Sequence, residues 1–173
     1  TGLFAGGGRV MDAGFADYAW SNDVRIEKLT GQRFTEDYRN NVLGRHGSRF
    51  DSAAATLALT AVFLTEPQRE FEALKVLQEA RYVLGLDTCD GSVVANLLRD
   101  LGLTGAADRL ATADAELLAA NAARTQKARS LMQIHGAQGV PALVVQDDKG
   151  SRLLSGNALY GGFDDLLSQQ RRV

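Results

Sequence analysis

The residues with the clearest chemical potential in this sequence are Gly139-Val140-Pro141, between the end of an expected helix and the start of an expected strand. Proline lacks the N–H that a central strand needs, so it is tolerated at the first strand position. An X-Pro bond can be cis at modest cost. In that form the backbone N–H and C=O of Val140 would be exposed beside the strand end and could pair with an extended peptide. The residues alone leave equally open a trans proline that merely begins a strand.

The chain has one cysteine, Cys89, between Asp87 and Asp90. Negative neighbours disfavour the reactive thiolate, so we expect an incidental loop cysteine. A single cysteine excludes an internal disulfide and a dithiol pair, and we assign no catalytic residue to this chain. The two histidines, His46 and His135, are far apart and lack metal-ligand spacing, so we expect no metal site. A protonated imidazole at His135 would interact favourably with the dipole of the long helix that it ends.

Charge and hydropathy exclude several other functions. Nineteen basic and twenty-one acidic residues give a net charge of −2, so no basic excess indicates binding to nucleic acid or to an anionic membrane. The longest apolar run, residues 53–64, is too short to span a bilayer. The glycines at 6–8 lack the Lys-Ser/Thr of a phosphate-binding loop and are expected to form a flexible turn.

Apolar periodicity predicts a mostly helical chain. Ser52 is expected to cap the third helix, and residues 65–68 have the form of a capping box. A strand end at 3–5, a strand at 140–145, and a returning strand at 152–155 complete the expected elements. The expected helices cover 12–29, 35–43, 53–64, 67–84, 90–101, 106–111, 113–135 and 163–169.

The expected sheet poses a problem of stability. A two-stranded hairpin is marginal in water, and residues 142–145 are apolar on both faces, as in a central strand covered by helices. Such a strand needs a second neighbour. We therefore expect one strand upstream of Thr1, either cut off or supplied by a partner chain, for example in a homodimer formed through the open sheet edge.

Taken in order, several segments resemble the DsbA family, in its cytoplasmic branch similar to protein disulfide isomerases. The resemblance implies a single α/β domain over 1–173 with a thioredoxin-like fold of the DsbA type and a large helical insertion. Residues 1–11 would be a strand end and loop of the thioredoxin part, 12–135 the insertion, and 136–173 the C-terminal hairpin and helix. The segments that carry the resemblance are 3–8, 29–34, 50–52, 78–85, 139–145 and 159–161.

The resemblance also implies a function. In this family a Cys-x-x-Cys motif after the first strand performs redox chemistry, and we expect it upstream of Thr1. Gly139, Val140 and Pro141 would then bind the backbone of a protein or peptide thiol/disulfide substrate. No cofactor is expected, and the resemblance implies a cytoplasmic location.

Two alternatives remain. Kappa-type glutathione transferases and 2-hydroxychromene-2-carboxylate isomerases resemble this architecture, with a serine in place of the first cysteine and glutathione bound near the same proline loop. In the other alternative, the chain is a peptide-binding module without catalysis.

Overall fold

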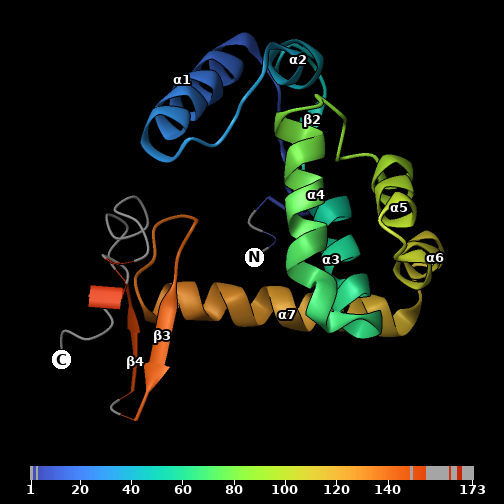
Figure 1. Ribbon diagram of the computed structural model, residues 1–173, viewed down its shortest axis with the longest axis vertical. Coiled ribbons are helices and arrows are strands. Elements are labelled where there is room, and N and C mark those ends of the chain that lie inside the picture. The colour runs from blue at the N-terminus through green and yellow to red at the C-terminus, as the bar shows by residue number, and fades with distance from the viewer. Residues whose placement is uncertain (1, 3, 149, 155–163, 165–166, 169–173) are drawn as a thin grey trace. The chain divides into compact units, whose positions relative to one another are not determined.

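The computed structural model describes residues 2, 4–148, 150–154, 164 and 167–168 (Figure 1). The chain forms two compact units, residues 1–125 and 126–173, and the long helix α7 begins in the first and ends in the second. The second unit continues with β3 (Val144–Asp147) and β4 (Gly150–Leu153). The first unit contains β1 (Arg9–Val10), α1 (Ala13–Thr30), α2 (Glu36–Tyr38), the π-helix η1 (Arg39–Leu43), β2 (Arg49–Phe50), α3 (Ala53–Thr65), the 3-10 helix η2 (Pro67–Arg69), α4 (Glu70–Tyr82), α5 (Gly91–Asp100), α6 (Thr104–Thr112) and the start of α7 (Ala115–Ile134).

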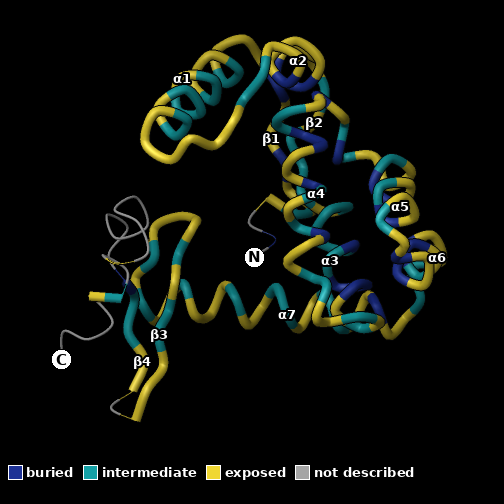
Figure 2. The backbone as a smooth tube through the Cα atoms, in the orientation of Figure 1, coloured by how far each residue is buried: buried dark blue, intermediate teal, exposed yellow. Residues whose placement is uncertain are grey.

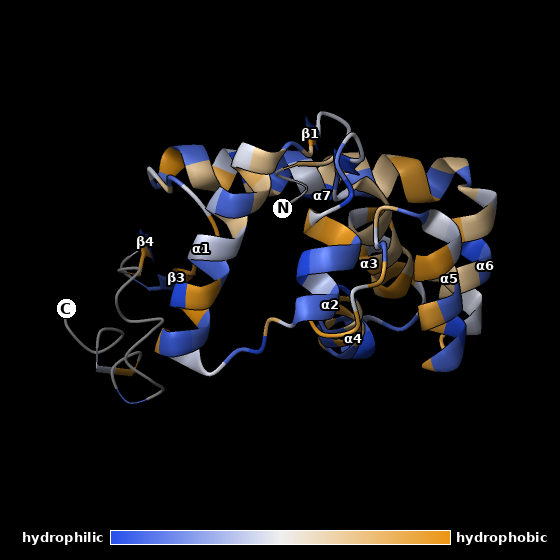
Figure 3. Cartoon of the chain, turned by 90° about the horizontal axis from the view of Figure 1, so that it is seen from above, coloured by the Kyte–Doolittle hydropathy of each residue, from blue (hydrophilic) through white to orange (hydrophobic). Residues whose placement is uncertain are grey.

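The main core of the first unit is built around α3. Its sequence is apolar on every side, which is typical of a helix buried on most faces. Helices α4, α5 and α6 pack around it, and their inward faces are apolar in Figure 3 and buried in Figure 2. The fully or nearly fully buried members of this core are Ala58, Ala61, Val62, Ala73, Leu77, Val94, Ala95, Leu98, Leu103, Ala106, Ala107, Leu110 and Leu117.

Helix ends follow the sequence in some places and differ in others. Thr35 and Asp90 cap α2 and α5 through their side-chain oxygens, as the sequence predicts for Thr35. Ser52 is the N-cap residue of α3, as predicted, but its side chain makes no capping bond, and the carboxylate of Asp51 accepts the hydrogen bond from the N–H of Ala53. The capping box at 65–68 does not form, since the hydroxyl of Thr65 bonds back to the carbonyl of Ala61.

The N-terminal strand lies later than predicted. Residues 4–7 form turns, and the two-residue strand β1 follows them. Its partner β2 lies inside 12–135, the segment predicted to be the helical insertion. Close approach of the two backbones explains the position. A Cβ on Gly8 would lie 2.3 Å from the carbonyl oxygen of Phe50, so only glycine fits there. Residue 3, the start of the predicted strand end, lies outside the described residues.

The second unit contains the predicted antiparallel hairpin. Val144 pairs with Leu153 and Asp147 with Gly150, and a further bond runs from the N–H of Leu154 to the carbonyl of Leu143. The first strand begins at Val144 and not at 140, because 140–142 form no ladder bonds. The second strand begins at Gly150 and not at 152. Within the described residues β3 pairs with β4 alone, and the predicted additional strand stays a prediction. The predicted helix 163–169 lies largely outside the described residues.

None of the helices described is long and apolar enough to cross a bilayer.

Candidate functional site

The predicted substrate-binding segment connects α7 to β3. Gly139, Val140 and Pro141 are all exposed, and Val140 retains 49% of its accessible surface. The Val140–Pro141 peptide bond is cis. In the described part of the chain, the backbone N–H and C=O of Val140 have no hydrogen-bond partner. The segment therefore presents a free donor and a free acceptor.

Local chemistry explains how the chain enters this segment. Gly136 adopts φ +65°, which glycine accommodates without a Cβ penalty, and it ends α7. The N–H of Ala137 then bonds to the carbonyl of Met132 at 2.8 Å, which satisfies one of the last carbonyls of the helix. On the other side, Leu143 joins the hairpin through its bond from Leu154. The segment is thus a short exposed stretch between two ordered elements.

The chemistry that the segment offers is main-chain hydrogen bonding. An extended chain placed along it could form main-chain hydrogen bonds with Val140, which is the way in which exposed strand edges recognise peptides. Among the described residues, no three His, Cys, Asp or Glu side chains gather closely enough to hold a metal ion.

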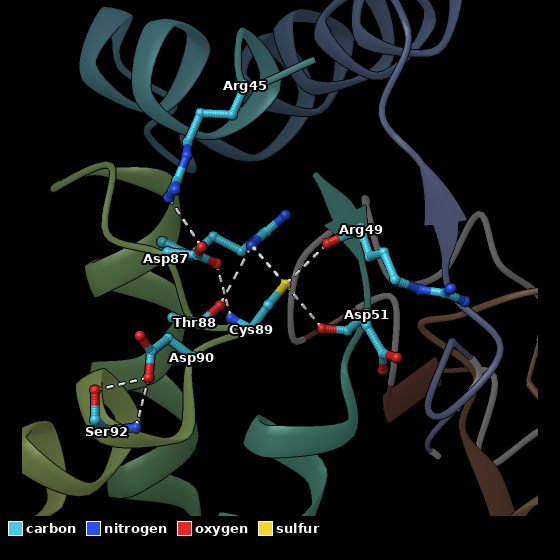
Figure 4. A network of polar contacts seen from close by, with 9 residues as sticks. Arg45, Arg49, Asp51, Asp87, Thr88, Cys89, Asp90 and Ser92 are labelled. Carbon is cyan, nitrogen blue, oxygen red and sulfur yellow. Dashed lines mark hydrogen bonds and ion pairs between the residues drawn. The ribbon is translucent and has the colours of Figure 1, made fainter. Parts of the chain in front are cut away.

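Cys89 lies in the first unit, in a polar network between β2 and α5 (Figure 4). Its thiol donates to the backbone carbonyls of Asp51 and Arg49, at Sγ–O distances of 3.0 and 3.3 Å. The buried guanidinium of Arg81 lies 4.0 Å from the sulfur and also donates to Thr88. These contacts connect the turn before α5 to strand β2, so the thiol has a structural part in the first unit.

A second polar cluster has no counterpart in the sequence-based prediction. The hydroxyl of Tyr38, on α2, donates to the carboxylate of Asp23, on α1, at 3.0 Å. Tyr38 is buried and packs edge-on against Tyr82 at a centroid distance of 5.1 Å. Burial raises the pKa of Asp23 to about 6, although the hydrogen bond from Tyr38 and the charge of Arg81 lower it. Asp23 and Tyr38 are fifteen positions apart in the sequence, so no spacing rule indicates the pair.

Asp23→Asn is expected to remove a pH dependence of stability. Folding binds a proton at Asp23 between the ordinary carboxyl pKa near 3.8 and the folded value of about 6, so the free energy of unfolding falls as pH rises through this window. Asparagine keeps an acceptor for Tyr38 but carries no charge. We expect the free energy of unfolding of the variant to exceed that of the wild type by about 1 kcal/mol at pH 7, after allowance for solvent screening at a half-buried site. Urea unfolding at pH 4.5 and 7 measures it.

The control is Asp17→Asn, at an exposed position on the same helix. It should keep the wild-type difference between the two pH values. Equal slopes for wild type and Asp23→Asn would contradict the assignment of this dependence to Asp23.

Comparison with known proteins finds matches among the solved structures. No protein-family model and no curated protein matches the sequence. The solved structure of the cytosolic disulfide reductase DsbM from Pseudomonas aeruginosa is 31% identical, with a TM-score of 0.78, over 96% of this chain and 82% of DsbM. DsbM with glutathione (GSH) matches at 30% identity and a TM-score of 0.76, with the same coverage. A candidate protein disulfide isomerase from Nitrosomonas europaea, 22% identical, covers 96% of this chain and 76% of its own with a TM-score of 0.76, which shows the fold alone.

Proposed function

This chain belongs to the DsbA family of thiol:disulfide oxidoreductases, and on that premise we propose that it serves thiol–disulfide exchange with polypeptide substrates. In this proposal, Gly139, Val140 and Pro141 hold the substrate backbone beside the reacting sulfurs. The observation that carries it is the exposed segment at 139–141, where Val140 presents an unpaired N–H and C=O. Main-chain pairing at such a segment orients a substrate without depending on its sequence.

The reacting pair of cysteines is proposed to lie outside these 173 residues. Thiol–disulfide exchange by a dithiol needs two cysteines, one attacking and one resolving. This sequence contains Cys89 alone, and that thiol donates to two backbone carbonyls between β2 and α5. We therefore propose that Cys89 takes no part in catalysis and that a Cys-x-x-Cys motif precedes Thr1 in the native protein.

The deciding experiment combines mass, thiol count and activity of the native protein. We expect a mass above 18.6 kDa, at least two thiols besides Cys89, and reduction or isomerisation of a disulfide-bonded protein such as insulin. Cys89→Ser should keep this activity. A protein with Cys89 as its single thiol and no exchange activity would contradict the proposal and favour a peptide-binding module.

A second candidate function is supported by the match to DsbM with glutathione. Under it, glutathione is the thiol partner at segment 139–141, as in the serine-type glutathione transferases and isomerases. Glutathione would then be needed for turnover, and conjugation or isomerisation would be the measured reaction. Thiol counting separates the two functions, because a serine-type enzyme would lack the additional pair of cysteines.

We propose a cytoplasmic location, in keeping with the cytosolic DsbM as a relative. Homodimerisation through the edge of β3 opposite β4 is a further proposal, as the alternative to a strand upstream of Thr1 on that edge. Sedimentation of the native protein tests it, and a strictly monomeric species would contradict it. A cytoplasmic thiol:disulfide oxidoreductase would act as a reductase or isomerase, because cytosolic thiols are kept reduced.

Val140→Asp tests the role of the segment in binding. A carboxylate at this exposed position would have to lose water when an apolar or backbone group docks beside it, so we expect KM for a polypeptide disulfide to rise about tenfold with kcat retained. Val10→Asp is the matched control, because Val10 is a similarly exposed valine, on β1. An unchanged KM in Val140→Asp would argue against binding at this segment.

A further inference from the structure

Both ends of the loop that carries the substrate-binding segment are tied to one strand, β4. At the far end, the N–H of Leu154, which directly follows β4, bonds to the carbonyl of Leu143 at 2.8 Å. At the near end, Nε2 of His135, at the end of α7, lies 3.2 Å from the hydroxyl oxygen of Ser151 on β4. The residues at the two ends of the loop 136–142, His135 and Leu143, therefore contact β4 and the residue that follows it.

The two contacts form a short frame. Ser151 and Leu154 are three residues apart, which corresponds to about 10 Å along an extended strand. The seven loop residues could span more than twice that length if extended, so the loop must fold back between its ends. Closing a loop onto fixed points reduces the number of backbone conformations that it samples. The frame thus limits where Val140 can place its free N–H and C=O.

Of the two contacts, the one between His135 and Ser151 is made by side chains. The hydroxyl can donate to the imidazole nitrogen or accept from it, so the contact forms with either tautomer. Ser151 is exposed and His135 is half-buried, so this hydrogen bond is made near the surface. We expect its loss to act on the loop at 136–142.

We infer that His135 and Ser151 are positioning residues, which hold the loop at 136–142 so that Gly139, Val140 and Pro141 meet the substrate backbone in register. This inference rests on the proposed function. Binding to a pre-ordered segment avoids the loss of conformational entropy that ordering a free loop would require. The pair thereby raises affinity for the substrate without touching it.

Ser151→Ala and His135→Ala in the full native protein test this inference. We expect KM for a polypeptide disulfide to rise about three- to tenfold with kcat retained, as expected for one lost hydrogen bond. Amide hydrogen exchange at Gly136 and Ala137, whose N–H groups bond to carbonyls at the end of α7, should quicken by a similar factor. The double variant should be no worse than either single variant, because both remove one contact. His135→Gln, which can keep a nitrogen near Ser151, should restore part of both effects.

Ser130→Ala is the matched control, since Ser130 is an exposed serine on α7. It should leave KM and exchange at the loop unchanged. An active wild type whose Ser151→Ala and His135→Ala variants match this control would overturn the positioning role alone. A wild type without thiol–disulfide exchange activity would refute the proposed function. The positioning role would then be refuted as well, whatever the rates of amide hydrogen exchange in the loop.

Discussion

Leu117→Ala is expected to lower the free energy of unfolding by about 2–5 kcal/mol. Leu117 has no accessible surface and lies in the first turn of α7, in the core built around α3. Removing its buried methyl groups loses transfer free energy and leaves a cavity that the neighbouring helices only partly fill. Urea unfolding followed by circular dichroism measures the loss.

The next residue supplies the control. Leu118 lies on the same helix but keeps 50% of its surface exposed, so Leu118→Ala should cost less than about 1 kcal/mol. Both variants have the same change in composition and in helix propensity, so their difference measures burial alone. Equal losses for the two variants would contradict the packing described for the start of α7.

Gly85→Ala is expected to lower the free energy of unfolding by about 3–4 kcal/mol. Gly85 follows α4 with φ +64°, and a Cβ there would lie 2.5 Å from the carbonyl oxygen of Asp37. The contact is with backbone, which no side-chain rotation can relieve. Two bonds from Thr35, to the carbonyls of Tyr82 and Val83, fix the same two segments against each other.

Gly102→Ala separates the two parts of this loss. Gly102 also has a left-handed backbone, at φ +80°, but a Cβ there would meet nothing within 4 Å. Only the conformational penalty of about 1 kcal/mol should remain. Chemical denaturation of both variants compares them directly, and a Gly85→Ala variant no less stable than Gly102→Ala would refute the close approach of α2 to the end of α4.

Both large effects concern distinctions that local patterns do not make. Leu117 and Leu118 are adjacent leucines of one helix, and only Leu117 is buried while Leu118 is half-exposed. Helix α7 is alanine-rich and has no strong apolar stripe, so its sequence does not distinguish a buried side. Likewise, Gly85 and Gly102 both follow a helix with a left-handed backbone, and only at Gly85 would a Cβ meet another backbone.

The sequence by itself determined most helices, the hairpin, the lone cysteine and the segment Gly139-Val140-Pro141. These follow from local rules: periodicity, caps, turn residues and the missing N–H of proline act within a few residues of one another. The resemblance to the DsbA family rested on the same short motifs in order, and the match to DsbM confirms it. The binding role of the segment stays a proposal.

Tertiary structure alone decided the pairing of β1 with β2, the pair of Asp23 and Tyr38, and the contact between His135 and Ser151. Two-residue strands are too short to carry a period, and polar pairs between different elements leave no pattern along the chain. Their energies come from burial and from direction, which exist only once distant residues have been brought together. The sequence thus located the segment Gly139-Val140-Pro141, and the fold decided which residues contact the two ends of its loop.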